Sequence, residues 1–120
     1  MKQTLARAQW LEDRRTYIGA TEVAAIMGIH PYDSAREVWL RKRGLIAEKE
    51  ATIPMELGTF VEPFIAAQYT KLTGFKTRKS KTYRHAKFPF CACNPDRETW
   101  FTVDGQRYRG GLELKSVGHW

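Results

Sequence analysis

Cysteines, long apolar runs and low-complexity segments are scarce or missing in this sequence of 120 residues. The two cysteines, Cys91 and Cys93, are spaced C-x-C, which places both side chains on one face of a strand and disfavours a disulfide between them. A structural zinc site needs about four ligands, and no C-x-x-C pair is present, so we expect free thiols in a reducing compartment. No run of about 18 apolar residues exists and the N-terminus lacks an apolar core, which argues against a membrane span and a signal peptide.

The composition is that of a folded, basic protein. Hydrophobic residues make up 42% and charged residues 28%, which is ordinary for a globular domain and argues against disorder. The length suits one domain covering residues 1–120. Lysine and arginine number 20 against 13 acidic residues, a net charge of +7 that suggests a polyanionic partner.

The order of predicted elements is α then β. Helices are expected over residues 4–15, 22–27, 35–43 and 55–73, with residues 45–54 as a loop. Thr21 is predicted to cap the second helix, and Ser34 with Glu37 forms a capping box for the third. Gly74 should stop the fourth helix, and Pro63 should kink it or mark its true start. Strands are expected over residues 75–84, 88–94, 98–103 and 112–117, with a turn at Asp104-Gly105.

Three residues near the end of the sequence suggest metal-dependent chemistry. Residues two apart on a strand face the same side, so Glu113 and Lys115 should share one face, and Asp96 follows a strand that could pair beside them. Two nearby carboxylates repel, and a divalent cation with oxygen ligands would relieve that repulsion. Such an arrangement suits phosphodiester hydrolysis, in which Lys115 could orient a water, help deprotonate it or offset charge. The alternative is a solvent-facing Glu–Lys pair on an edge strand.

Glu62 is a candidate third acid. It lies on the side of the fourth predicted helix that also carries Ile65, Tyr69 and Leu72. A carboxylate beside an apolar face is costly to bury unless it is paired or binds a metal. It is therefore either a further acid for the metal site or a boundary residue that reaches solvent.

Basic residues are concentrated between Lys76 and Lys87. Six lysines and arginines occur there with no acidic residue, and four of them are candidates for contacts with a DNA backbone: Arg78, Lys79, Lys81 and Arg84. The alternative is an edge strand whose lysines prevent aggregation.

The chain resembles the YqaJ-type viral recombinases, relatives of the phage lambda-type exonuclease in the PD-(D/E)xK nuclease superfamily. The resemblance runs through nearly the whole sequence. Five blocks carry it: Trp10–Gly28 continuing to Pro31-Tyr32, Glu37–Leu40 with Lys42 and Gly44, Gly58–Pro63, Asn94-Pro95-Asp96, and Gly111–Lys115. The fold that it implies is α+β, a restriction-endonuclease-like core with N-terminal helices followed by a mixed sheet.

The resemblance implies a role for each matching residue. Glu62, Asp96 and Glu113 would be the metal-binding acids, the backbone carbonyl of Leu114 a further ligand, and Lys115 the catalytic lysine. Arg14 and Thr21, where the family often has serine, would contact the terminal or scissile phosphate. The implied ion is Mg²⁺, with Mn²⁺ as a substitute. Arg97 stands where the family commonly has glycine.

The implied activity is 5′-to-3′ exonucleolytic hydrolysis of double-stranded DNA in phage recombination. It would take place in the cytoplasm of a bacterial or phage-infected cell, with a single-strand annealing protein as partner. Lambda-type relatives form rings of three, which leaves a homo-oligomer open. A non-catalytic DNA-binding module and a structure-specific endonuclease are the alternatives. The sequence ends five residues after Lys115, so we expect a sheet that is incomplete at the C-terminus and lacks the family's downstream helix, strands, glutamine and tyrosine.

Overall fold

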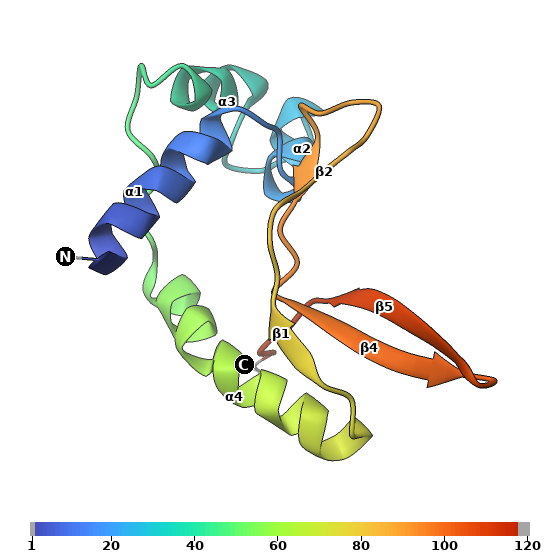
Figure 1. Cartoon of the computed structure of the whole chain (residues 1–120). Coiled ribbons are helices and arrows are strands. Elements are labelled where there is room, and N and C mark those ends of the chain that lie inside the picture. Colours follow the sequence, from blue (N-terminus) through green and yellow to red (C-terminus); the bar gives the residue numbers. More distant parts are fainter. Residues whose placement is uncertain (1, 118–120) are drawn as a thin grey trace. The chain divides into compact units, whose positions relative to one another are not determined.

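The structure is a computed structural model that describes residues 2–117. The chain divides into two compact units (Figure 1). Unit 1 comprises Met1–Lys49 and Tyr83–Cys93, and unit 2 comprises Glu50–Thr82 and Asn94–Trp120. Residues 118–120, which end the segment after Lys115, lie outside the described part. Within residues 2–117, no helix is long and apolar enough to cross a membrane.

Unit 1 combines three helices with a short β-ribbon. Its elements are α1 (Lys2–Arg15), α2 (Ala20–Ile26), α3 (Ala35–Lys42), β2 (Tyr83–Arg84) and β3 (Ala92–Cys93). Helix α3 contacts both α1 and α2, and the buried side chains of this unit include Tyr17, Ala25 and Val38. The ribbon joins the helices at Ile18, whose N–H donates to the Phe90 carbonyl at 2.6 Å.

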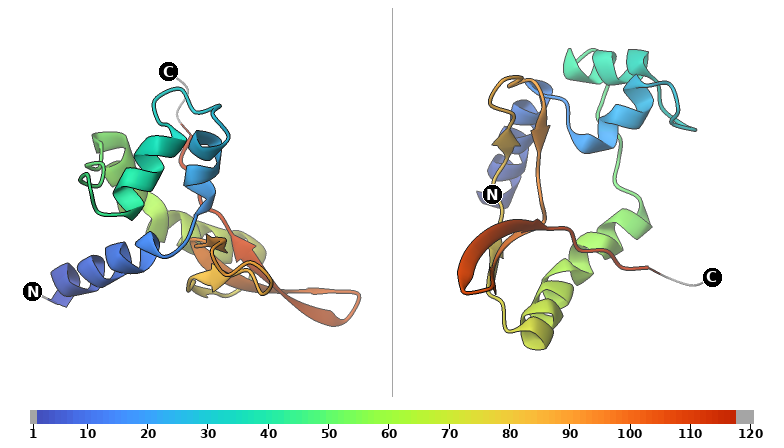
Figure 2. Two further views of the ribbon diagram at one scale, coloured as in Figure 1. Left: turned by 90° about the horizontal axis from the view of Figure 1, so that it is seen from above. Right: turned by 90° about the vertical axis from the view of Figure 1, so that its right-hand side faces the viewer.

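Unit 2 consists of one long helix and a three-stranded sheet. Helix α4 (Ile53–Thr73) leads through Gly74 into β1 (Thr77–Lys79), and the sheet order is β1-β4-β5 with β4 (Arg97–Val103) in the centre. Figure 2 shows the hairpin of β4 and β5 (Gln106–Leu112) from two further sides. Gly74 has φ 74° and ends α4, as the sequence predicts, because glycine adopts this conformation without a Cβ clash.

Pro63 lies inside α4 and does not mark its start. The helix begins ten residues earlier, at Ile53, where Pro54 occupies the first turn and its missing N–H costs no helical hydrogen bond. Pro63 is tolerated in the interior of the helix at the loss of one hydrogen bond.

The β4–β5 hairpin corrects the prediction for the last strand. Asp104 and Gly105 both have positive φ, 48° and 77°, as a two-residue hairpin turn requires. This turn pairs Val103 with Gln106 and Arg97 with Leu112. The last strand is therefore residues 106–112, not 112–117, because β4 has no residue left to pair with the chain after Leu112.

Other differences from the sequence prediction are local. Helix α2 is capped by Gly19 and not by Thr21, because the Glu22 carboxylate accepts the Gly19 N–H at 2.9 Å, and the helix starts two residues earlier than predicted. Of the predicted strand 88–94, residues 92–93 are β-strand; the chain before them turns, with the Cys91 N–H donating to the Phe88 carbonyl at 2.8 Å. Both cysteines are free, as expected. The strand pairs among the described elements are antiparallel, where a mixed sheet was expected, and the parallel pairing is confined to a bridge of Ile18 with Cys91.

The capping box at the start of α3 is confirmed. The Ser34 side chain accepts the Glu37 N–H at 3.2 Å, and its hydroxyl lies 3.1 Å from the Glu37 carboxylate. Replacing Ser34 with alanine should lower the free energy of unfolding by about 1 kcal/mol, because one N–H of the first turn loses its acceptor. Urea denaturation of the two proteins measures the difference, and a Ser80→Ala variant, changed in the loop after β1, should unfold with the parent protein.

Candidate functional site

The acidic residues singled out by the sequence lie in unit 2, at the open end of the β4–β5 hairpin. Arg97 and Leu112 form the last pair of the ladder, so Asp96 precedes one strand directly and Glu113 follows the other. The Asp96 carboxylate accepts the backbone N–H of Leu114 at 2.6 Å. This bond brings Asp96 against the Glu113-Leu114-Lys115 segment, although Asp96 and Glu113 are 17 positions apart in the sequence.

Gly111 permits the close approach that positions Asp96. A Cβ on Gly111 would lie 3.3 Å from the Pro95 ring, so the Asn94-Pro95-Asp96 turn rests directly on the backbone of β5. A larger side chain would push this turn away from the strand. Gly111 is therefore required by close packing against Pro95, and not by the conformation of a turn.

Glu113 and Lys115 form an exposed ion pair. Their side chains are in contact at 2.5 Å, and they are 57% and 70% exposed. The chain has left the sheet here, but Leu112 and Leu114 remain half-buried while Glu113 and Lys115 face solvent, as the predicted alternation requires. The hydrogen bond that the Lys115 ammonium donates to Glu113, together with the charges of Glu113 and Asp96, raises the pKa of Lys115. Lys115 is therefore a cation at neutral pH.

Glu62 of α4 pairs with Arg97, the first residue of β4. The guanidinium Nη1 of Arg97 contacts the Glu62 carboxylate and also donates to the Asp96 carbonyl at 2.8 Å. The Arg97 side chain is buried, and Glu62 is partly exposed. The sequence predicted that Glu62 could join Asp96 at one site, but it did not reveal that the Arg97 guanidinium contacts both the Glu62 carboxylate and the Asp96 carbonyl.

The three acids fit a hard divalent cation by chemistry, since carboxylate and carbonyl oxygens are its preferred ligands. Their present contacts are all internal: Glu62 with Arg97, Asp96 with the Leu114 N–H, and Glu113 with Lys115. Within residues 2–117, no group of three or more His, Cys, Asp or Glu side chains is close enough to hold a metal ion. The structure therefore brings Asp96 to the Glu-x-Lys segment and keeps the carboxylates as separate pairs.

Arg14 and Thr21 belong to unit 1 and lie at the junction of α1 and α2. Arg14 is 3.8 Å from the Glu22 carboxylate, and Thr21 is exposed in the first turn of α2. Lys42 of α3 joins the two helices, because its ammonium contacts Glu22 at 2.7 Å and the Arg14 carbonyl at 2.5 Å. The sequence analysis named Lys42 only as part of a family block and did not identify this contact.

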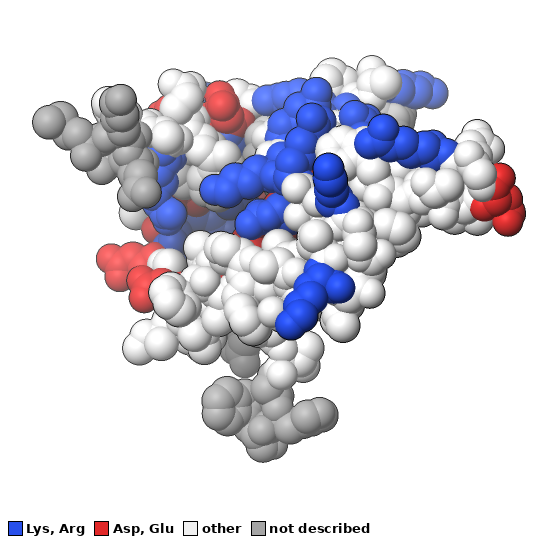
Figure 3. Space-filling view, turned by 60° about the horizontal axis from the view of Figure 1, so that its bottom comes forward, with Lys and Arg blue, Asp and Glu red and all other residues white. Residues whose placement is uncertain are grey.

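The four residues predicted to contact DNA differ in the contacts that their side chains make within the protein. Arg78 pairs with Glu98 at 2.7 Å, and Arg84 donates to the Thr16 hydroxyl at 2.6 Å and stacks over Tyr17. Lys79 and Lys81 are exposed. On the face drawn in Figure 3, lysine and arginine side chains are more prominent than acidic ones.

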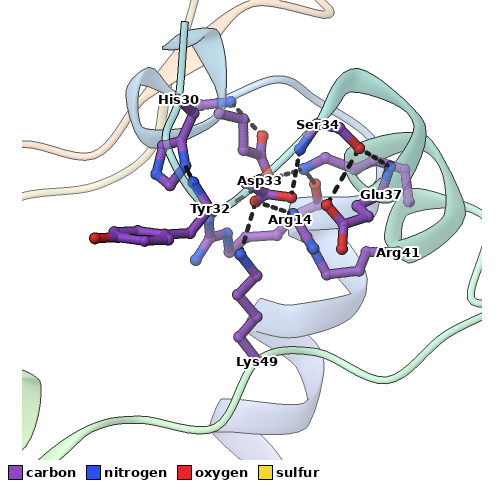
Figure 4. A network of polar contacts seen from close by, with 11 residues as sticks. Arg14, His30, Tyr32, Asp33, Ser34, Glu37, Arg41 and Lys49 are labelled. Atoms are coloured by element: carbon purple, nitrogen blue, oxygen red, sulfur yellow. Dashed lines mark hydrogen bonds and ion pairs between the residues drawn. The ribbon is translucent and has the colours of Figure 1, made fainter. Parts of the chain in front are cut away.

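Asp33 is the centre of a polar network in unit 1 that sequence analysis did not identify (Figure 4). Its carboxylate binds Arg41 at 2.5 Å, Lys49 at 3.0 Å and the Ser34 N–H at 3.0 Å. Burial alone would raise the pKa of Asp33, but hydrogen bonds from Arg41, Lys49 and Ser34 outweigh it and hold the pKa well below its usual value. This network joins the start of α3, its C-terminal turn and the loop that follows.

Comparison with known proteins places these features in a family. The YqaJ-like viral recombinase domain matches residues 9–119. The Bacillus subtilis (strain 168) protein YqaJ, itself uncharacterized, is 30% identical over 95 residues, which are 78% of this chain and 30% of that protein. The crystal structure of LHK-Exo in complex with dAMP is similar with a TM-score of 0.57 and 21% identity, over 75% of this chain and 47% of that one.

The structural likeness confirms the α+β fold expected from the sequence. The chain spans less than half the length of either relative, 30% of one and 47% of the other. The family match contains all five of the sequence blocks that indicated the resemblance, from Trp10 to Lys115. The chain belongs to the YqaJ-like viral recombinase domain family.

Proposed function

We propose that this protein is the metal-dependent nuclease domain of a phage-type recombination system, acting on double-stranded DNA as a 5′-to-3′ exonuclease. One observation carries the proposal. The Asp96 carboxylate is hydrogen-bonded to the backbone of the Glu113-Leu114-Lys115 segment, so two acids and an ammonium from distant parts of the sequence meet at one end of a hairpin. The family membership supports the same chemistry.

The chain's own residues would divide the work as follows. Asp96, Glu113, Glu62 and the Leu114 carbonyl would hold a Mg²⁺ or Mn²⁺ ion, which lowers the pKa of a bound water and polarises the phosphoryl oxygen. Lys115 is kept protonated by Glu113, so it suits charge stabilisation of the phosphoryl transition state better than removal of a proton. Arg14 and Thr21 would bind a phosphate of the same DNA through charge-assisted hydrogen bonds.

The test is cleavage of a linear duplex that carries a different fluorescent label at each 5′ end. The wild-type protein should shorten this duplex in the presence of Mg²⁺, and cleavage should stop when EDTA is added. Asp96→Asn should reduce the rate by more than about 100-fold, because a neutral amide binds a divalent cation poorly and the ion supplies several kcal/mol. Asp104→Asn, the same change at the exposed turn of the same hairpin, is the matched control and should cleave normally. Full activity in Asp96→Asn would refute the proposal.

The second candidate function is a DNA-binding module without catalysis. The internal pairing of all three carboxylates favours it, together with the net charge of +7. It predicts salt-sensitive DNA binding that ignores Mg²⁺ and survives Asp96→Asn. Nicking of circular plasmid DNA, in contrast, would indicate an endonuclease of the same superfamily.

Arg97 gives a prediction about metal affinity that does not depend on cleavage. As long as its guanidinium pairs with Glu62, that carboxylate is engaged by an internal cation and competes poorly as a metal ligand. Arg97→Gln should therefore bind Mn²⁺ about tenfold more tightly, the equivalent of about 1.4 kcal/mol. Electron paramagnetic resonance of free Mn²⁺ measures the change.

The Arg97→Gln/Glu62→Gln double variant is the control for this prediction. It should return to the wild-type affinity, because the released carboxylate is then missing. Equal Mn²⁺ affinity in wild type and Arg97→Gln would show that the Arg97–Glu62 pair does not limit metal binding.

A further inference from the structure

We infer that the sheet of unit 2 carries a second nucleic-acid contact, separate from the acids, on the face turned away from α4. Four residues form this arginine–tryptophan surface: Arg78, Trp100, Arg107 and Arg109. It would bind the phosphate backbone of DNA without reading its sequence. Three of the four, all except Arg78, were not among the residues singled out from the sequence.

The strand register places these residues on one face. In an antiparallel pair, directly opposed residues project to the same side, and Trp100 opposes Arg109, Thr102 opposes Arg107 and Glu98 opposes Arg78. The alternate residues of β4 project to the other side. There Arg97 contacts Glu62 and Thr99 lies 3.5 Å from the Tyr69 hydroxyl, so that side faces α4. Trp100 and its arginine neighbours consequently lie on the opposite side.

Trp100 holds two of the arginines in place. The Arg78 guanidinium lies 4.8 Å from the indole centroid and that of Arg107 lies 5.9 Å from it. Both distances are within the range of cation–π attraction. Because a stacked guanidinium has lost much of its freedom already, it pays less entropy when its N–H donors bind a ligand.

The charge of the surface favours an anionic partner. Its acidic residue is Glu98, which is 3% exposed and bonded to Arg78 through both Nε and Nη2, at 2.8 and 2.7 Å. Arg107 and Arg109 are exposed on the same face. One buried acid among three arginines leaves an excess of two positive charges beside an aromatic ring.

The chemistry points to phosphates rather than bases. Guanidinium groups bind phosphate oxygens through paired N–H donors. Guanidinium groups already stack on the Trp100 ring, which leaves the ring poorly placed to stack on a base. A contact of this kind positions a duplex and is independent of its sequence.

The surface is well placed to hold the duplex next to the proposed cleavage site. This part of the inference rests on the proposed function. Arg109 precedes Glu113 by four residues, a span of about 14 Å in extended chain. That span matches about four base pairs at ~3.4 Å per step along each strand. The arginines would therefore bind phosphates a few nucleotides from the phosphate at the proposed metal site.

The test measures duplex DNA binding in EDTA by fluorescence anisotropy between 50 and 200 mM salt. Each lost phosphate contact reduces the slope of log K against log salt by about 0.9, so Arg107→Gln/Arg109→Gln should reduce it by about 1.8. Arg36→Gln/Arg43→Gln removes the same charge from exposed positions on and beside α3 in unit 1, and its slope should stay closer to wild type. Equal slope losses in the two double variants would overturn the inference, because they would indicate general electrostatics.

A third variant distinguishes the ordering of the arginine side chains by Trp100 from the effect of their positive charge. Trp100→Leu keeps all three arginines and should weaken binding several-fold, because the guanidinium groups lose the ring that orders them. Unchanged affinity would overturn the role of Trp100. Circular dichroism melting would verify that each variant is folded. Failure of the nuclease proposal is seen independently, as Mg²⁺-dependent cleavage that persists in Asp96→Asn.

Discussion

Replacing Lys115 with methionine should lower the rate of DNA cleavage by about 100- to 1,000-fold, the usual cost of losing one charge-stabilising group. Methionine keeps an unbranched side chain of similar length and removes the ammonium. Lys115 is highly exposed, and its ion pair is with the likewise solvent-facing Glu113, so the substitution should leave stability nearly unchanged. Single-turnover cleavage of a labelled duplex, with saturating Mg²⁺, measures the effect on chemistry alone.

Two further variants define what Lys115 contributes. Lys71→Met makes the same change at an exposed position in the last turn of α4 and should cleave at the wild-type rate. Lys115→Arg keeps the positive charge and should retain more activity than Lys115→Met, since the proposed role is electrostatic. If Lys115→Met cleaves as fast as Lys71→Met, the ammonium has no part in the reaction.

Asp33→Ala should be the most destabilising change in unit 1, at about 3 kcal/mol, because it leaves the buried guanidinium of Arg41 without its partner. The two side chains are 11% and 10% exposed and are 2.5 Å apart. Lys49, the other basic partner, is 53% exposed and contributes little through its charge. Urea denaturation at neutral pH gives the free energy of unfolding, and Asp13→Ala at an exposed position of α1 should be nearly neutral.

The contribution of Asp33 should also depend on pH. Its pKa in the folded protein is held below the ordinary value of 3.8, so the folded state binds its proton less readily than the unfolded chain does. The stabilisation is therefore complete at pH values above 3.8 and is lost as the pH falls toward the folded-state pKa. The difference in unfolding free energy between wild type and Asp33→Ala should be constant between about pH 5 and 8 and shrink in stronger acid. A constant difference down to pH 2 would contradict this assignment.

The local sequence determined several of the element boundaries, since the signals act over only a few residues. Ser34 and Glu37 start α3, Gly74 ends α4, and Asp104-Gly105 turns the last hairpin, each through backbone geometry or a hydrogen bond that neighbouring residues supply. The family motifs were equally readable, because their residue types and order follow directly from the sequence. The candidate acids Asp96 and Glu113 were found in this way.

The contacts of the candidate residues were determined only by the tertiary structure. The register of β4 with β5 ends the last strand at Leu112, and a buried arginine, Arg97, engages Glu62. Lys42 of α3 joins α1 to α2 through two contacts, one with the Arg14 carbonyl 28 positions away and one with the Glu22 carboxylate. Register and ion pairing depend on which segments pack together, and residues that are distant in the chain contribute to each contact. The sequence therefore specified which chemical groups are present and several of the points at which helices and turns begin or end, while the packing of distant segments determined which of those groups meet.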